Sequence, residues 1–81
     1  MLPSVRLLRA ARVLLGWSQQ ELADASGVHQ TVIGRIEAKS STPRTVTTER
    51  LAKALEDAGI VFFSDAGMEG IKISTRMPTP E

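Results

Sequence analysis

Hydrophobic positions recur with helical spacing in four segments of the chain, and glycine, proline or hydroxylated residues separate these segments. In the first segment, leucines and alanines fill a broad apolar arc, while Arg6 and Arg9 lie on the opposite side. Ser4 is placed to cap this helix and Gly16 to end it. The pattern therefore predicts four helices, over residues 4–15, 18–25, 30–38 and 45–58.

The second and third predicted helices are short and are separated by a glycine turn. Ser18 and Glu21 have the spacing of a capping box, which marks the start of the second helix. Ala23 is small enough for the next helix to approach closely, and Gly27 can adopt the positive φ that a tight turn needs. This spacing predicts a packed helical hairpin. Packing alone does not establish DNA binding, because many helical hairpins share it.

The pattern changes after Gly59. Residues 60–63 and 71–74 are rich in Ile, Val and Phe, and residues 64–70 between them contain two glycines and two acids. We expect two short strands joined by a hairpin loop, followed by a disordered tail over residues 75–81, where two prolines stand. The expected organisation is a helical domain at 1–59, a β-hairpin at 60–74 and the tail.

Composition narrows the functional classes. The 81 residues suffice for one small domain, and the absence of cysteine excludes a disulfide framework and a thiolate zinc site. A single histidine leaves too few ligands for another zinc site, so we expect no metal and no cofactor. No His/Asp/Ser set or glycine-rich phosphate loop indicates an enzyme. No apolar run approaches the roughly 20 residues of a membrane span, and no signal-peptide core is present, so a cytoplasmic protein is expected.

The net charge of +1 is divided unevenly along the chain. Residues 1–53 contain eight Lys/Arg and four Asp/Glu, a balance of +4, and residues 54–81 contain two and five, a balance of −3. A basic first part and an acidic second part suit a polyanion that faces one side of the molecule. Random scatter in a small protein explains the charge split equally well.

The combination of short motifs is more specific than any of them alone. The chain resembles the Xre/lambda-repressor-like (Cro-type) helix-turn-helix family over about residues 6–58. The motifs that carry this resemblance are Gly16-Trp-Ser-Gln-Gln-Glu-Leu-Ala23, Ser26-Gly-Val28, Ile33-Gly-Arg-Ile-Glu37 and Pro43 before a long helix. The resemblance implies a mostly α fold, a repressor-like bundle of four helices with a helix-turn-helix, to which this chain adds a short C-terminal β-hairpin.

The resemblance also implies that the third helix enters the major groove of DNA. Gln30, Thr31 and Arg35 match the base-contacting positions of the family. Their chemistry agrees, because Gln pairs with adenine, Arg pairs with guanine, and Thr offers a hydroxyl and a methyl group. The alternative is that these are ordinary solvated side chains.

Phosphate contacts are implied at the edges of the same surface. Gln19 matches the family position that contacts a phosphate at the start of the second helix. His29 replaces the usual Ser or Thr cap, so it either contacts a phosphate or is merely tolerated. Lys39, Ser41 and Arg44 lie in the loop where the family touches the DNA backbone, although ordinary solvation explains each of them equally well.

Four further positions are interpreted structurally. Arg12 and Glu37 match a family ion pair that ties the first helix to the end of the third. Trp17 is interpreted as a core or boundary anchor. Gly34 stands inside the third helix at a cost of about 1 kcal/mol relative to Ala, and its small size would let the DNA backbone or a base methyl group approach closely.

The C-terminal hairpin exceeds what a minimal bundle needs, and both faces of its first strand are apolar. We expect a homodimer in which two hairpins form a shared sheet that also covers the first helix. The predicted function is sequence-specific double-stranded DNA binding as a transcriptional regulator, with repression favoured. The alternative is an antitoxin-like subunit that binds another protein through the hairpin and regulates its own promoter. The expected dimerisation residues are Leu7, Leu14, Ile60, Phe62, Phe63, Ile71 and Ile73.

Overall fold

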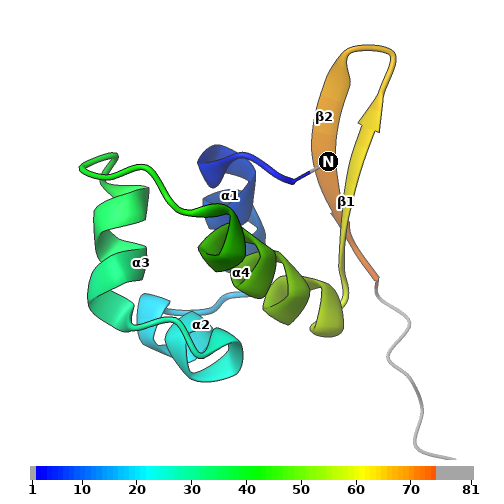
Figure 1. Cartoon of the computed structure of the whole chain (residues 1–81). Coiled ribbons are helices and arrows are strands. Elements are labelled where there is room, and N and C mark those ends of the chain that lie inside the picture. The colour runs from blue at the N-terminus through cyan, green and yellow to red at the C-terminus, as the bar shows by residue number, and fades with distance from the viewer. Residues whose placement is uncertain (1, 75–81) are drawn as a thin grey trace, which may run out of the picture.

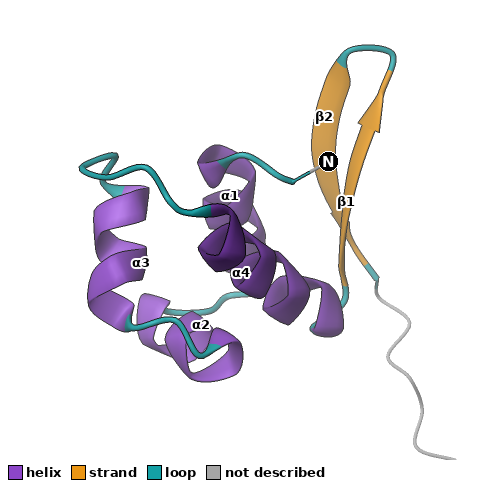
Figure 2. Ribbon diagram, viewed as in Figure 1, coloured by secondary structure: helices purple, strands orange, loops and turns teal. Residues whose placement is uncertain are grey.

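The computed structural model describes residues 2–74, which form four helices followed by an antiparallel β-hairpin (Figures 1 and 2). This confirms the expected fold class. The predicted tail at 75–81 lies outside the described residues. The elements are α1 (Val5–Leu14), α2 (Gln19–Ser26), α3 (Gln30–Glu37), α4 (Thr45–Asp57), β1 (Ile60–Asp65) and β2 (Met68–Ile73).

The core lies where α4 meets α1, α2 and the base of the hairpin, while α3 packs on α1 and α2. Leu55 of α4 is fully buried, together with Leu22 of α2, Ile33 of α3 and Ile60 of β1. These side chains come from four different elements, so one small core holds the bundle and the hairpin together. The remaining buried hydrophobic residues are Leu8, Ala11, Ala23, Val28, Ile36, Leu51, Ala52 and Ala54.

The helix boundaries follow local capping chemistry. The Ser4 hydroxyl accepts a hydrogen bond from the N–H of Leu7 at 3.3 Å. Ser18 and Glu21 form the expected capping box, with bonds of 3.0 and 2.8 Å in the two directions. Gly27 ends α2 with a φ of 75°, as a left-handed cap requires. These contacts fix the direction in which the chain enters and leaves α2.

The hairpin differs from the expected one in length. Each strand has six residues, and only Ala66 and Gly67 connect them, so the predicted seven-residue loop is wrong. Both turn residues have positive φ, 51° and 78°. Such a turn matches the right-handed twist of the strands, which lets pairing continue to Asp65 and Met68.

One face of the hairpin packs on the helices. Ile60 pairs with Ile73 and Phe62 with Ile71, and these two pairs share that face. Ile60 is only 2% exposed. The structure therefore corrects the expectation that Ile60 contacts a second protein, because its side chain is already buried in the core of its own chain. Along residues 2–74, no helix is both long enough and apolar enough to cross a membrane.

Candidate nucleic-acid interface

The geometry of α2 and α3 determines which side chains of α3 reach solvent. Ile33 and Ile36 are buried against the bundle, and Val28 anchors the turn before the helix. Because a helix repeats every 3.6 residues, these anchors direct Thr31 and Arg35 away from the core, and both are exposed. Thr31 and Arg35 therefore share an outward surface that is free to contact a ligand.

Glu37 at the end of α3 holds Arg12 of α1 through two hydrogen bonds. Arg12 Nε lies 2.7 Å from Glu37 Oε2, and Nη2 lies 2.8 Å from Oε1. A third nitrogen, Nη1, donates to the carbonyl oxygen of Trp17 at 2.6 Å. This is the ion pair that the sequence motif implied, and it joins α1, α3 and the turn before α2. Trp17 itself is half-buried against the core.

A series of hydrogen-bonded polar side chains, the polar chain, continues from this ion pair to the start of α3. Gln19 donates from Nε2 to Glu37 Oε1 at 3.1 Å, and its Oε1 accepts from Gln30 Nε2 at 2.7 Å. The Gln30 amide is therefore held in one orientation, with its carbonyl oxygen and its second N–H still free. One free acceptor and one free donor side by side match the N6 and N7 atoms of adenine.

The role of the Gln19 side chain differs from the expected phosphate contact. Its amide is already engaged at both ends by Glu37 and Gln30. The backbone N–H of Gln19 begins α2, where helical N–H groups lack internal partners and favour an anion. Sequence reasoning identified the residue but missed this bridging role, since it depends on how α2 and α3 are placed.

The pKa of Glu37 is lowered from its usual value, although two opposite influences act on it. Burial by itself raises the pKa. The hydrogen bonds from Arg12 and Gln19, together with the positive charges of Arg12 and Arg9, lower it and prevail. Glu37 is consequently held as a carboxylate, the form that accepts all three hydrogen bonds.

His29 serves as the N-cap of α3. Its Nδ1 accepts a hydrogen bond from the N–H of Thr31 at 3.1 Å. Because Nδ1 is the acceptor, a neutral ring carries its proton on Nε2, which is then available as a donor. The side chain is exposed at the start of α3. Capping and a phosphate contact are therefore compatible roles for the two ring nitrogens.

The loop after α3 carries the other residues that were expected to contact the DNA backbone. Lys39, Ser41 and Arg44 are all exposed there, and Lys39 adopts a φ of 61°. Ser40 fixes the loop by donating from Oγ to the carbonyl oxygen of Arg35 at 3.1 Å. Within residues 2–74, neither Lys39 nor Arg44 has a carboxylate at ion-pair distance. Both charges are free for an anionic ligand.

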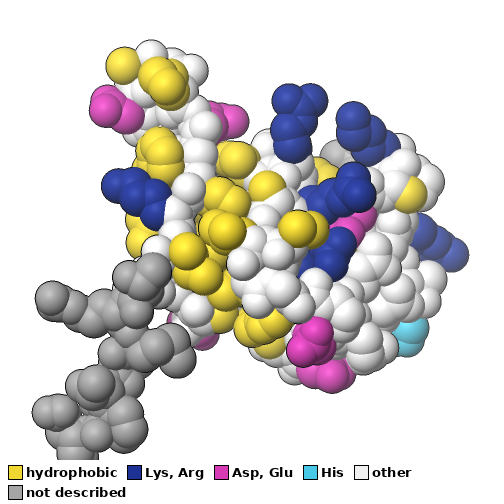
Figure 3. All heavy atoms as spheres, turned by 180° about the vertical axis from the view of Figure 1, so that it is seen from behind, with side chains coloured by type: hydrophobic (Ala, Val, Ile, Leu, Met, Phe, Trp, Pro, Cys, Tyr) yellow, Lys and Arg dark blue, Asp and Glu magenta, His cyan; other side chains and the backbone are white. Residues whose placement is uncertain are grey.

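A hollow of about 310 Å³ lies between α1, α2 and α3. Arg9 lines it and was not among the expected contact residues. The sequence feature that could have identified Arg9 is its position three residues before Arg12, which places the two side chains near each other on one side of α1. In the view of Figure 3, most Lys and Arg side chains lie on the part of the surface away from the hairpin. The hollow is lined by Arg9, Arg12, Gln19, Gly34, Glu37 and Ala38.

Two comparisons with known proteins agree with this geometry. A family model described as helix-turn-helix matches residues 8–56, more than half of the chain. The chain is also 35% identical over 57 residues to the HTH-type transcriptional regulator SutR of Escherichia coli (strain K12). That match covers 70% of this chain and 32% of SutR, so the chain spans about a third of the length of this relative.

Proposed function

The chain belongs to the helix-turn-helix family, and on that basis we propose that it binds double-stranded DNA sequence-specifically as a transcriptional regulator. Repression is the direct consequence where its site overlaps a promoter. The observation that carries the proposal is the polar chain from Arg12 through Glu37 and Gln19 to Gln30. It sets a base-contacting amide in a fixed orientation at the start of an exposed helix.

In this proposal, α3 lies in the major groove of DNA. Gln30 pairs with an adenine through its free carbonyl oxygen and N–H. Arg35 is exposed one turn further along and pairs with a guanine through its guanidinium group. Thr31 lies beside them and contacts a base with its hydroxyl or methyl group. Two bidentate contacts from one short helix suffice to distinguish a preferred half-site.

The contacts to the DNA backbone surround this helix. The backbone N–H of Gln19 and the Nε2–H of His29 donate at the starts of α2 and α3. Lys39, Ser41 and Arg44 contact phosphates from the loop after α3. Because the cations lie on one side of the helix-turn-helix, they orient the protein on any duplex, and binding weakens as salt concentration rises.

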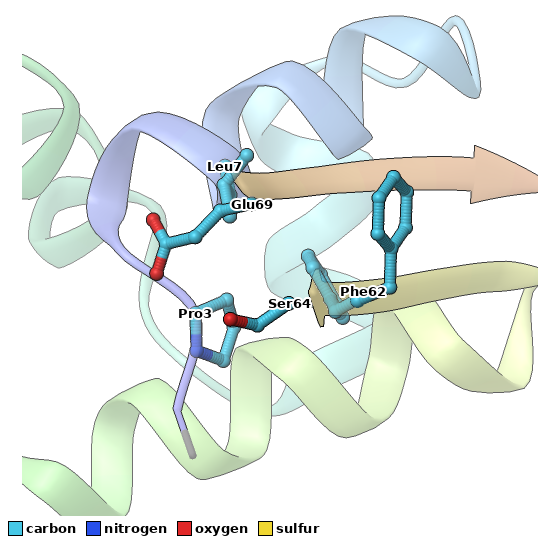
Figure 4. Close-up of a pocket in the computed structure, with 6 residues that line it drawn as sticks. Pro3, Leu7, Phe62, Ser64 and Glu69 are labelled. Carbon is cyan, nitrogen blue, oxygen red and sulfur yellow. The ribbon is translucent and has the colours of Figure 1, made fainter. Parts of the chain in front are cut away.

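We further propose that the protein acts as a homodimer through the face formed by α1 and the hairpin. Val13 and Leu14 of α1 are 59% and 46% exposed, and they border a groove that reaches Ile71 of β2. Nearby, Leu7 and Phe62 line a hollow that Glu69 and Ser64 border (Figure 4).

The occupant that we propose for this face is a second copy of the chain. Arg6 and Arg9 of α1 line this groove, whereas the hairpin carries Asp65 and Glu69 near its turn against a single cation, Lys72, so two copies have complementary charges. We assign the hairpin, residues 60–74, as the dimerisation element of the helical domain. A dimer also suits a palindromic operator with half-sites one helical turn apart.

Sedimentation equilibrium at micromolar concentration tests the dimer. We expect a dimer for the wild type and a monomer for Leu14→Glu, with an unchanged circular dichroism spectrum. A strictly monomeric wild type contradicts this part of the proposal. Stoichiometric co-purification of a different protein that Leu14→Glu abolishes would favour the antitoxin-like alternative.

Fluorescence anisotropy tests the DNA-binding function itself. The probes are the duplex upstream of the gene for this protein and a random duplex of equal length, each at two salt concentrations. We expect tighter binding to the upstream duplex, and we expect Arg35→Ala to reduce that preference. If no duplex selected from a random library binds better than the library itself, the proposed function is wrong.

A further inference from the structure

Gly34 is half-buried on the side of α3 that lines the hollow between α1, α2 and α3, and the backbone there does not require a glycine. The glycines with positive φ among the described residues are Gly16, Gly27, Gly59 and Gly67, and Gly34 is not one of them. Gly34 adopts the ordinary helical conformation inside Gln30–Glu37. Any L-residue can adopt that conformation, and alanine stabilises a helix better than glycine does.

Packing does not require a glycine at this position either. A Cβ atom built on Gly34 would lie 3.4 Å from Gln19 Oε1 and 3.8 Å from Gln30 Nε2, which are ordinary van der Waals distances. Both neighbouring atoms are ends of side chains. The fold would therefore accept alanine and gain helix stability. The absence of a side chain points to a requirement set by something that approaches from outside the chain.

The surroundings of Gly34 indicate what approaches. Gln30 stands one turn earlier on α3, and Arg35 is the next residue in sequence. The orientation of the Gln30 amide, fixed by Gln19, selects an adenine. Gln30 and Gly34 are four residues apart and share one side of α3, so a duplex that Gln30 contacts also comes close to the Cα of Gly34. The α-carbon offers only C–H groups to that base pair.

We propose that Gly34 is a specificity-determining position whose bare α-carbon contacts the 5-methyl group of a pyrimidine in the major groove. The proposal rests on the proposed DNA-binding function and names one feature of its operator. The 5-methyl group of thymine is the apolar feature of the major-groove edge, and it projects beyond the hydrogen-bonding atoms of the base. 5-Methylcytosine presents the same group, so the methyl is the ligand whichever base carries it.

Other parts of DNA fit this position less well. A phosphate in this hollow would bind the Arg9 guanidinium or the N–H groups at the start of α2, and it would gain no hydrogen bond from an α-carbon. A polar atom of a base edge would lose its hydrogen bonds to water against an α-carbon and gain none in return. A methyl group loses no hydrogen bond, and it gains an apolar contact only while the position stays open. An alanine at 34 would occupy the space that the pyrimidine methyl takes.

The test begins with a duplex selected from a random library by the wild-type protein. Each thymine of that duplex is replaced singly by uracil, which removes only the methyl group, and affinity is measured by anisotropy at fixed salt. We expect one uracil substitution, next to the adenine bound by Gln30, to weaken the wild type by about fourfold, the value of one buried methyl group. Gly34→Ala should weaken binding to the unmodified duplex by about tenfold, through overpacking.

The two changes should also compensate each other. In Gly34→Ala, the same uracil substitution should strengthen binding, because it removes the group that the new methyl meets. Val32→Ala is the matched control, since Val32 is exposed on another side of α3, and it should show the wild-type response to uracil. Cytosine and 5-methylcytosine at the same position identify the source. If 5-methylcytosine restores the affinity as fully as thymine does, the methyl group alone is the ligand. If only thymine restores the affinity, the ligand is thymine.

Thermal unfolding supplies an independent measurement. We expect Gly34→Ala to raise the melting temperature by roughly 2–6 °C while it weakens DNA binding. A lower melting temperature would show that the fold needs this glycine and would overturn the inference. Equal weakening of every duplex, with the same uracil response as the wild type, would also overturn it but leave the proposed function standing. Failure of the wild type to select any sequence is a failure of the proposed function instead.

Discussion

Arg12 and Glu37 are 25 residues apart in sequence and form a two-point ion pair, with hydrogen bonds of 2.7 and 2.8 Å. Their side chains are only 13% and 9% exposed. Glu37 also accepts from Gln19, which in turn orients Gln30. One carboxylate therefore links the stability of the bundle to the geometry of the proposed base contact.

Replacement of this carboxylate by an amide should destabilise the protein. In Glu37→Gln, the shape is nearly unchanged, but Arg12 is left largely buried without an opposite charge. We expect the free energy of unfolding at pH 7 to fall by about 2 kcal/mol, as measured by urea denaturation. Asp57→Asn is the control, because the Lys53–Asp57 pair, with side chains 77% and 68% exposed, should contribute less than about 1 kcal/mol. Equal effects of the two substitutions would contradict the role of burial.

The contribution of Glu37 should depend on pH. Its pKa is lower in the folded protein than in the unfolded chain, so the unfolded chain takes up a proton first as the pH falls. The stabilisation is complete above the unfolded pKa of about 4.5, and it disappears as the pH falls through the lower folded pKa. The difference in unfolding free energy between wild type and Glu37→Gln should therefore be constant near neutrality and shrink below about pH 4.5. A difference that stays constant down to pH 2 would show that ionisation is irrelevant to it.

Truncation of Arg35 and truncation of Arg44 should change DNA binding in different ways. Arg35→Ala removes a proposed base contact and should weaken binding to a selected duplex by about one to two orders of magnitude, with little effect on random DNA. Arg44→Ala removes a proposed phosphate contact. It should weaken all duplexes alike and reduce the slope of log K against log salt by about one. Anisotropy titrations at three salt concentrations separate these outcomes, and loss of discrimination in Arg44→Ala would reverse the two assignments.

Local patterns in the sequence predicted the features that local forces determine. The apolar spacing identified all four helices, and Ser18 with Glu21 identified the start of α2. The Arg12–Glu37 pair was accessible only through the family motif, because nothing local connects residues so far apart. The position of Ile60 was misjudged, since its burial depends on how the hairpin folds back on the helices.

Two parts of the structure depended on geometry that residue types do not encode. Gln19 bridges Glu37 and Gln30 only because α2 and α3 meet at a particular angle. The hairpin turn places Ala66 at positive φ, a conformation that alanine rarely adopts and that no sequence rule assigns to it. In both cases the tertiary arrangement decides the outcome.

A better cap at position 29 should stabilise α3. His29 caps the helix through an imidazole nitrogen, whereas serine is among the preferred residues for that position. We expect His29→Ser to raise the free energy of unfolding by about 0.5 kcal/mol and to weaken DNA binding modestly, because the Nε2 donor is lost. Ser18→Ala is a control in the other direction. It removes the side-chain cap of α2 and should lower the free energy of unfolding by about 1 kcal/mol. Tighter DNA binding by His29→Ser would exclude His29 as a phosphate contact.

The ring of Phe63 covers Gly70 on the outer face of the hairpin, and this contact should make the effect of an alanine depend on its neighbour. A Cβ atom on Gly70 would lie 2.5 Å from Phe63 Cζ, so the ring must move and lose its contact with Lys72, whose Nζ lies 5.1 Å from the ring centre. We expect Gly70→Ala to cost about 1 kcal/mol in urea denaturation. In a Phe63→Ala background, the same change should be neutral or stabilising, because alanine suits a strand better than glycine does. The two costs would simply add if the ring and the glycine were independent, and the double-mutant cycle measures that difference directly.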